Sequence, residues 1–222
     1  LMRVFMLGFD AYSVDWQPVV YALAVLTLLT GAVLAVVQTD VKRMMAYSSI
    51  NHAGWVLVGV QAASDQGIEA ALFYLATYTF LIAGTFGVIT LVGRAGDGHH
   101  SLDDYRGLGR SRPGLALLLT VFLFAQAGVP LTSGFFAKFY VIAAAVDAGS
   151  TWLAVVAMLS SVISAFLYLR ITVSLYMGDT DEAPAAPRLT VPVGAGIALA
   201  LCVVVTLVVG VWPGSIAEVA RD

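Results

Sequence analysis

The sequence contains little charge and almost no cysteine. Charged residues make up 11% of its 222 residues, against about 25% in ordinary soluble domains. The single cysteine, Cys202, lies in an apolar run, so no intrachain disulfide and no Cys/His ligand set for haem, iron–sulfur or zinc is indicated. No G-x-G-x-x-G phrase follows a strand pattern, and the net charge of −3 gives no sign of nucleic-acid binding. These shortages argue against a soluble enzyme with its own cofactor.

Apolar residues are abundant instead, at 60% of the chain. The apolar runs are far longer than the ~10 residues of a membrane strand and do not alternate with polar residues, so helices are predicted. We therefore expect an all-α, polytopic transmembrane helix bundle that forms a single membrane domain over residues 1–222. It would comprise the end of one helix at 1–9 and six full spans, at 18–38, 46–62, 68–93, 114–147, 151–177 and 190–211.

The chain begins Leu1-Met2-Arg3, and no signal peptide is recognisable, because no basic region precedes an apolar run. We therefore expect a fragment whose N-terminal part is missing.

The basic residues divide unequally between the two sets of alternate loops. One set, with Arg170 close to it, holds Lys42, Arg43, Arg94, Arg106, Arg110, Arg112 and Arg188. The other set holds only Arg3 and Arg221. Because cytoplasmic loops carry an excess of Lys and Arg, the segment 94–113 is expected on the cytoplasmic side and the C-terminus on the outer side.

The fourth predicted span, 114–147, is too long to be one membrane-crossing helix. As a single helix it would measure about 51 Å, against a hydrocarbon core of ~30 Å. It also contains Gly128, Pro130 and Gly134, and proline disrupts the helix around it. We predict a discontinuous helix broken at 128–134, of the kind tolerated where helices line a cavity or are covered by protein.

Lys138 is the only Lys, Arg, Asp or Glu deep within an apolar span. A central lysine costs about 2.5–3.5 kcal/mol to insert, so it needs a partner or water. Burial and the positive end of the second half-helix should both disfavour its charge, which would let Lys138 exchange a proton. The alternative is a lysine that snorkels to the interface or serves as a structural partner.

Polar residues form stripes on three other spans. On the second, Ser48 and Ser49 share a helix face with His52, which titrates near neutrality and could relay protons or simply bond to backbone. The other stripes comprise Tyr74, Thr77, Tyr78 and Thr85 on the third span and Ser160, Ser161, Ser164 and Tyr168 on the fifth. They could line a water chain, although such residues more often form hydrogen bonds between helices.

Two phrases, QTDVKRMMAYSSINHAGW (38–55) and AGVPLTSGFFAKFYVI (127–142), together resemble the antiporter-like membrane subunits of respiratory complex I. In that family the first phrase joins two spans, and the second marks a broken helix that carries a titratable residue. The resemblance covers nearly all of the chain. M-type subunits usually have Glu at the position of Lys138, and L-type subunits continue into a long lateral helix. A Lys at this position and an end shortly after the last span are most similar to the N-type branch.

The resemblance implies a 14-helix protein built of two inverted five-helix repeats, of which this chain would hold the second. The first repeat's Glu and Lys sites would lie upstream. The implied function is that of a proton-translocating membrane-arm subunit of NADH:quinone oxidoreductase. Lys138 would be the proton carrier and His52 the proton relay. The residues lining a water chain would be Tyr74, Tyr78, Ser49 and Ser164.

The same resemblance implies that this chain holds no cofactor or metal. Flavin and iron–sulfur clusters would belong to partner subunits, and quinone to the complex. The other partners would be membrane-arm subunits and the lipid of a bacterial plasma membrane or mitochondrial inner membrane. Two alternatives remain open: a subunit of a multisubunit sodium/proton antiporter, and a structural membrane-arm subunit that does not pump.

Overall fold

The computed structural model of the chain describes residues 2, 4–93, 100–177 and 191–212. Within these ranges the protein is all-helical, apart from an isolated bridge between Asp40 and Ser101. The helices are α1 Ser13–Val36, α2 Val41–Gln61, α3 Asp65–Gly93, α4 Leu108–Ser111, α5 Pro113–Ala127, α6 Ser133–Asp147, α7 Thr151–Tyr176 and α8 Val193–Val211; short turns span Val4–Gly8, Asp10–Tyr12 and Leu102–Tyr105. The predicted all-α bundle is confirmed.

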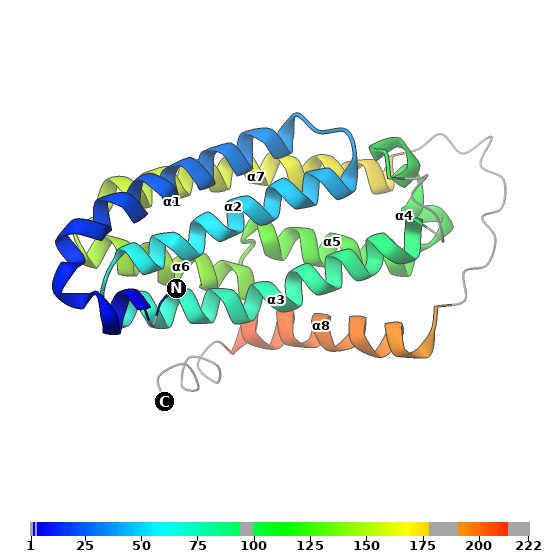
Figure 1. Cartoon of the computed structure of the whole chain (residues 1–222). Coiled ribbons are helices and arrows are strands. Elements are labelled where there is room, and N and C mark those ends of the chain that lie inside the picture. Colours follow the sequence, from blue (N-terminus) through cyan, green and yellow to red (C-terminus); the bar gives the residue numbers. More distant parts are fainter. Residues whose placement is uncertain (1, 3, 94–99, 178–190, 213–222) are drawn as a thin grey trace.

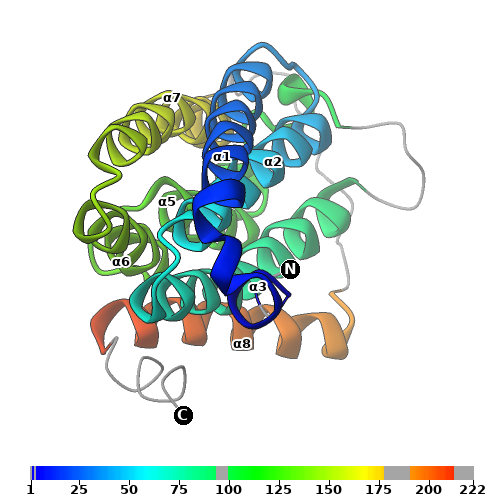
Figure 2. The same cartoon turned by 60° about the vertical axis from the view of Figure 1, so that its left-hand side comes forward.

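The long helices run side by side, and α8 lies along α3 at one side of the bundle (Figures 1 and 2). Among the described residues, four helices are long and apolar enough to cross a membrane, namely α1, α3, α7 and α8. Helices α5 and α6 have 15 residues each, which is about 22 Å apiece. They follow one another end to end, so only the pair together has the length of a full crossing.

The interruption between α5 and α6 has a clear local cause. Helix α5 ends at Ala127 because Gly128 adopts a left-handed conformation, with φ of 91° and ψ of 37°, which glycine accepts without strain. Pro130 lies in the connecting loop, and α6 begins at Ser133. A side chain on Gly134 would collide with the carbonyl of Ala125, so glycine lets the start of α6 lie against the last turn of α5.

The loop between α1 and α2 is tied to the segment that follows residue 99. The Asp40 side chain caps α2 by accepting a hydrogen bond of 2.9 Å from the backbone N–H of Arg43. The backbone N–H of Val41 donates to the His100 carbonyl at 2.7 Å. The start of the QTDVKRMMAYSSINHAGW phrase thus forms a joint, which is this backbone contact between the α1–α2 loop and the segment after residue 99.

Arg170 secures the same end of the bundle from α7. Its guanidinium donates to the carbonyls of Val36 and Gln38, at 2.9 and 3.1 Å, and so satisfies acceptors left over where α1 ends. The Tyr105 ring is buried beside this joint, and burial raises the pKa of its phenol, with the Asp40 carboxylate adding to the effect. Through its contacts with Val36 and Gln38, Arg170 lies at the end of the bundle where α2 begins with Lys42 and Arg43.

Buried polar residues form a layer between two apolar clusters. On α7, Ala157 belongs to one cluster and Leu167 to the other, and buried Ser160 and Ser164 lie between them. On α2, His52 lies between the clustered Met45 and Trp55 in the same way. This layer contains the break between α5 and α6, and it positions the site described next.

Candidate functional site

Lys138 lies in the polar layer, on the second turn of α6, with only 7% of its surface exposed. Its Nζ donates hydrogen bonds to the Ala127 carbonyl at 3.0 Å and to Ser161 Oγ at 2.8 Å. The same atom lies over the Trp55 ring, 5.3 Å from the ring centre. A carbonyl, a hydroxyl and an indole face thus surround the ammonium, and none of them carries a formal charge.

The contact with Ala127 changes the expected electrostatics. The sequence led us to expect the positive end of α6 to oppose the charge of Lys138. The side chain instead reaches back to the C-terminal end of α5, where the unpaired carbonyls form the negative end of a helix. The break therefore supplies a hydrogen-bond acceptor for the buried ammonium group.

Both ring nitrogens of His52 are hydrogen-bonded to tyrosines from other helices. Nδ1 lies 2.7 Å from the Tyr74 hydroxyl on α3, and Nε2 lies 2.9 Å from the Tyr168 hydroxyl on α7. Tyr168 is in turn 2.6 Å from Ser48 Oγ, one turn before His52 on α2. The four side chains form an unbroken chain of hydrogen bonds from Ser48 to Tyr74, which we call the Ser48–Tyr74 chain.

Tyr78 and Ser49 form a side branch. The Tyr78 ring stacks on the His52 ring, with ring centres 4.4 Å apart and planes 20° from parallel. Its hydroxyl donates to Ser49 Oγ at 2.8 Å, and Ser49 donates to the Met45 carbonyl at 3.0 Å. This branch ends on the backbone, and it orients the imidazole without extending the chain.

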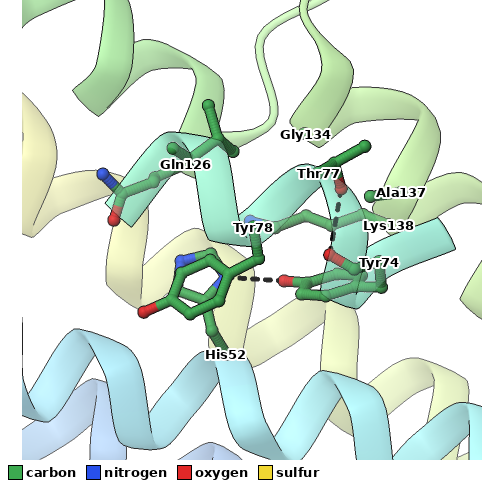
Figure 3. A pocket seen from close by; sticks show the side chains of 9 residues that line it. His52, Tyr74, Thr77, Tyr78, Gln126, Gly134, Ala137 and Lys138 are labelled. Atoms are coloured by element: carbon green, nitrogen blue, oxygen red, sulfur yellow. Dashed lines mark hydrogen bonds between the residues drawn. The ribbon is translucent and has the colours of Figure 1, made fainter. Parts of the chain in front are cut away.

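A small cavity joins Lys138 to the His52 group (Figure 3). It is lined by His52, Tyr74, Thr77, Tyr78, Leu81, Gln126, Gly134, Ala137 and Lys138. Its volume is about 10 Å³, which is the lower limit for one water molecule. The sequence-predicted carrier and relay therefore line the same small cavity, whose volume is close to the minimum for a single bridging water.

The remaining predicted residues are placed less centrally. Ser164 is buried, but it does not line this cavity, and its hydroxyl has no hydrogen-bond partner among the described residues. Its neighbour Ser161 is the residue that binds Lys138. Gly128 packs against the lysine stem, where an added Cβ would lie 3.1 Å from Lys138 Cδ. Pro130 lies in the loop, away from the cavity lining.

Two residues of the site were not predicted from the sequence. Gln126 is fully buried and donates from Nε2 to Thr85 Oγ1 at 2.7 Å, which ties the end of α5 to α3. Trp55 supplies the aromatic face over Lys138. Both left a trace in the sequence: a glutamine in the apolar run just before the break, and a tryptophan three residues after His52, on the same helix face.

The arrangement is suited to moving protons. Hydroxyl groups donate and accept at once, and an imidazole can accept at one nitrogen while it releases from the other. The Ser48–Tyr74 chain has this composition throughout. In the part of the chain that the structure describes, no three His, Cys, Asp or Glu residues come together to hold a metal ion.

The chain is similar to known proteins over nearly its whole length. Residues 1–164 match the model of the family described as NADH:quinone oxidoreductase/Mrp antiporter, transmembrane. NADH-quinone oxidoreductase subunit N 1 of Solibacter usitatus is 42% identical over 219 residues, covering 99% of this chain and 45% of that protein. Subunit N of Salinispora arenicola is 46% identical over 222 residues, covering 99% and 42%.

The fold is also similar to a chain in the structure of respiratory complex I from Thermus thermophilus with bound NADH. The TM-score is 0.80 at 29% identity, over 94% of this chain and 44% of that chain. The chain thus spans somewhat less than half the length of the relatives that it matches.

Proposed function

This chain belongs to the NADH:quinone oxidoreductase/Mrp antiporter transmembrane family, and we propose that it forms part of a proton-translocating membrane-arm subunit of NADH:quinone oxidoreductase. Its relatives at 42% and 46% identity carry the name subunit N of that enzyme, which favours the oxidoreductase over the antiporter within the family. Four apolar helices and the family assignment make it an integral membrane protein.

The observation that carries the proposal is the setting of Lys138. A proton carrier must be stable with and without its proton. Two hydrogen bonds and an aromatic face stabilise the charged amine. No carboxylate among the described residues pairs with it, so the neutral amine can form without stranding a buried anion. Lysine readily changes its protonation state when buried, and arginine does not. A lysine held only for packing would not need these two hydrogen bonds and this aromatic contact.

The Ser48–Tyr74 chain is the proposed path to the carrier. Ser48 lies two turns from the start of α2, on the side of the basic residues, and Tyr74 lines the cavity of Lys138. A proton accepted by His52 at Nε2 leaves from Nδ1 through the Tyr74 hydroxyl. A water in the cavity would complete the transfer to Lys138.

The proposal includes a topology. Six crossings would be made by α1, α2, α3, the α5–α6 pair, α7 and α8, as the second of two inverted repeats. Helices α2 and α7 carry Lys42, Arg43 and Arg170 at one end of the bundle, and this end would face the cytoplasm. The C-terminus would then lie outside. The redox chemistry, with flavin, iron–sulfur clusters and quinone, would belong to partner subunits.

The rival within the family is a subunit of a sodium/proton antiporter. A tag on the full-length subunit separates the two readings. We expect flavin- and iron–sulfur-containing subunits to co-purify, and NADH to drive proton uptake by inverted membrane vesicles that depends on Lys138. Proton movement driven by a sodium gradient, without such partners and without a response to NADH, would instead favour the antiporter.

A further inference from the structure

Trp55 connects the two halves of the site. It is fully buried on α2, three residues after His52, and its ring faces the Nζ of Lys138 at 5.3 Å. The same ring stacks nearly parallel on Tyr74, with planes 8° apart and centres separated by 6.2 Å. One aromatic side chain therefore contacts the proposed carrier and the last member of the Ser48–Tyr74 chain.

The position of the indole matches the needs of an ammonium group. An ammonium has three N–H donors, and hydrogen bonds to Ala127 and Ser161 use two of them. The negative face of an aromatic ring attracts a cation, most strongly for tryptophan and most strongly out of water. The Trp55 face is thus the third contact of a buried cation.

Packing alone does not account for a tryptophan at this position. Its Nε1 is buried and has no hydrogen-bond partner among the residues that the structure describes. Burying an N–H without a partner is costly, and a phenylalanine would fill an apolar site without that cost. The larger quadrupole of the indole is the property that phenylalanine lacks.

We propose that Trp55 is a positioning residue for Lys138. The Trp55 ring keeps the protonated amine at the helix break until the proton leaves through the cavity. The proposal rests on the proton-carrying role of Lys138. Removing the aromatic face would make Lys138 hold its proton less tightly. The loss would be felt first at high pH, where protonation of the lysine becomes limiting.

The other titratable groups near Lys138 are few. Helix α5 has none, and Tyr168 of α7 is hydrogen-bonded to His52. Helix α8 carries only Cys202. Those that share the cavity are His52 from α2 and Tyr74 and Tyr78 from α3. Substitutions at Trp55 leave all of these groups in place, but the ring also stacks on Tyr74, so the Lys138→Ala background below tests whether a changed pH profile arises through Lys138.

The test is the pH profile of NADH-driven proton uptake by inverted vesicles that contain the complete complex. Fluorinated tryptophans at position 55 keep the shape of the ring and weaken the negative potential of its face. The alkaline limb of the profile should move stepwise to lower pH as fluorines are added. Trp55→Leu should move it by about one pH unit and Trp55→Phe by less. Trp152→Leu, at an exposed position on α7, is the matched control and should leave the profile unchanged.

A profile that does not respond to fluorination would overturn the proposal, even if Trp55→Leu failed to assemble. A Lys138→Ala background separates this failure from that of the proposed function. If Trp55 acts through Lys138, Trp55→Leu should add no further loss to Lys138→Ala. Full pumping by Lys138→Ala would refute the carrier role itself. If Lys138→Ala loses pumping but the fluorinated proteins keep the native pH profile, only the role of Trp55 is refuted.

Discussion

Lys138 Nζ donates a 3.0 Å hydrogen bond to the carbonyl of Ala127, the last residue of the helix that precedes its own. In a continuous helix that carbonyl would accept a backbone N–H one turn later. The interruption frees it, and the lysine of the next half-helix uses it. The broken helix and the buried lysine are therefore parts of one arrangement, because the break creates the acceptor that makes the buried charge tolerable.

The geometry of this break predicts different outcomes for two glycines. An added Cβ at Gly134 would collide with the Ala125 carbonyl, whereas at Gly114 it would meet nothing within 4 Å. Gly134→Ala should destabilise the subunit by about 1–3 kcal/mol, because α5 and α6 must move apart. The measurement is the yield and thermal stability of the assembled complex. Equal behaviour of Gly134→Ala and Gly114→Ala would contradict the close approach of the two helices.

The Ser48–Tyr74 chain predicts that two tyrosines on α3 differ in importance. Tyr74→Phe removes the hydroxyl bound to His52 Nδ1 but keeps the ring that stacks on Trp55. Proton uptake should fall at least about tenfold, the scale of a lost proton-transfer partner, with assembly intact. Tyr78→Phe is the matched control, since among the described residues its hydroxyl bonds to Ser49 alone, on the side branch. It should cost no more than about twofold, and a larger loss for Tyr78→Phe than for Tyr74→Phe would place the path elsewhere.

The proposed orientation predicts the labelling of an exposed position on α4. Arg110→Cys, combined with Cys202→Ala to remove the one thiol of these 222 residues, should react with a membrane-impermeant maleimide in inverted vesicles. The same reagent applied to intact cells should leave it unlabelled, because the basic end is assigned to the cytoplasm. Ready labelling from outside the cell would reverse the topology.

Much of the fold could be predicted because membrane helices need long runs of apolar residues, which are visible in the sequence. Long apolar runs marked the helices, and the combination of Gly128, Pro130 and Gly134 pointed to the interruption between Ala127 and Ser133. The joint at the basic end could not be predicted in the same way. Its backbone bridge joins Asp40 to Ser101, and Arg170 contacts Val36, so both depend on how segments far apart in the sequence meet.

The site was predictable as a set of residue types but not as a set of contacts. Lys138 and His52 stood out because titratable groups are rare in apolar helices. The partners of Lys138 did not, since one is a backbone carbonyl and another, Trp55, looks like an ordinary apolar residue. Ser161 and Ser164 lie three residues apart on one helix face, and residue type alone did not reveal that Ser161 would bind the lysine.

If Lys138 carries a proton during turnover, the number of protons taken up per NADH oxidised must depend on its amine. The measurement uses inverted vesicles with assembled complexes of equal abundance. Lys138→Ala should insert and assemble, because alanine is easier to bury than lysine, yet its proton uptake per NADH should fall. Lys138→Arg should recover little, because arginine does not release its proton. An assembled Lys138→Ala complex with the native ratio of protons to NADH would show that Lys138 does not carry the proton and would favour a structural role for this subunit.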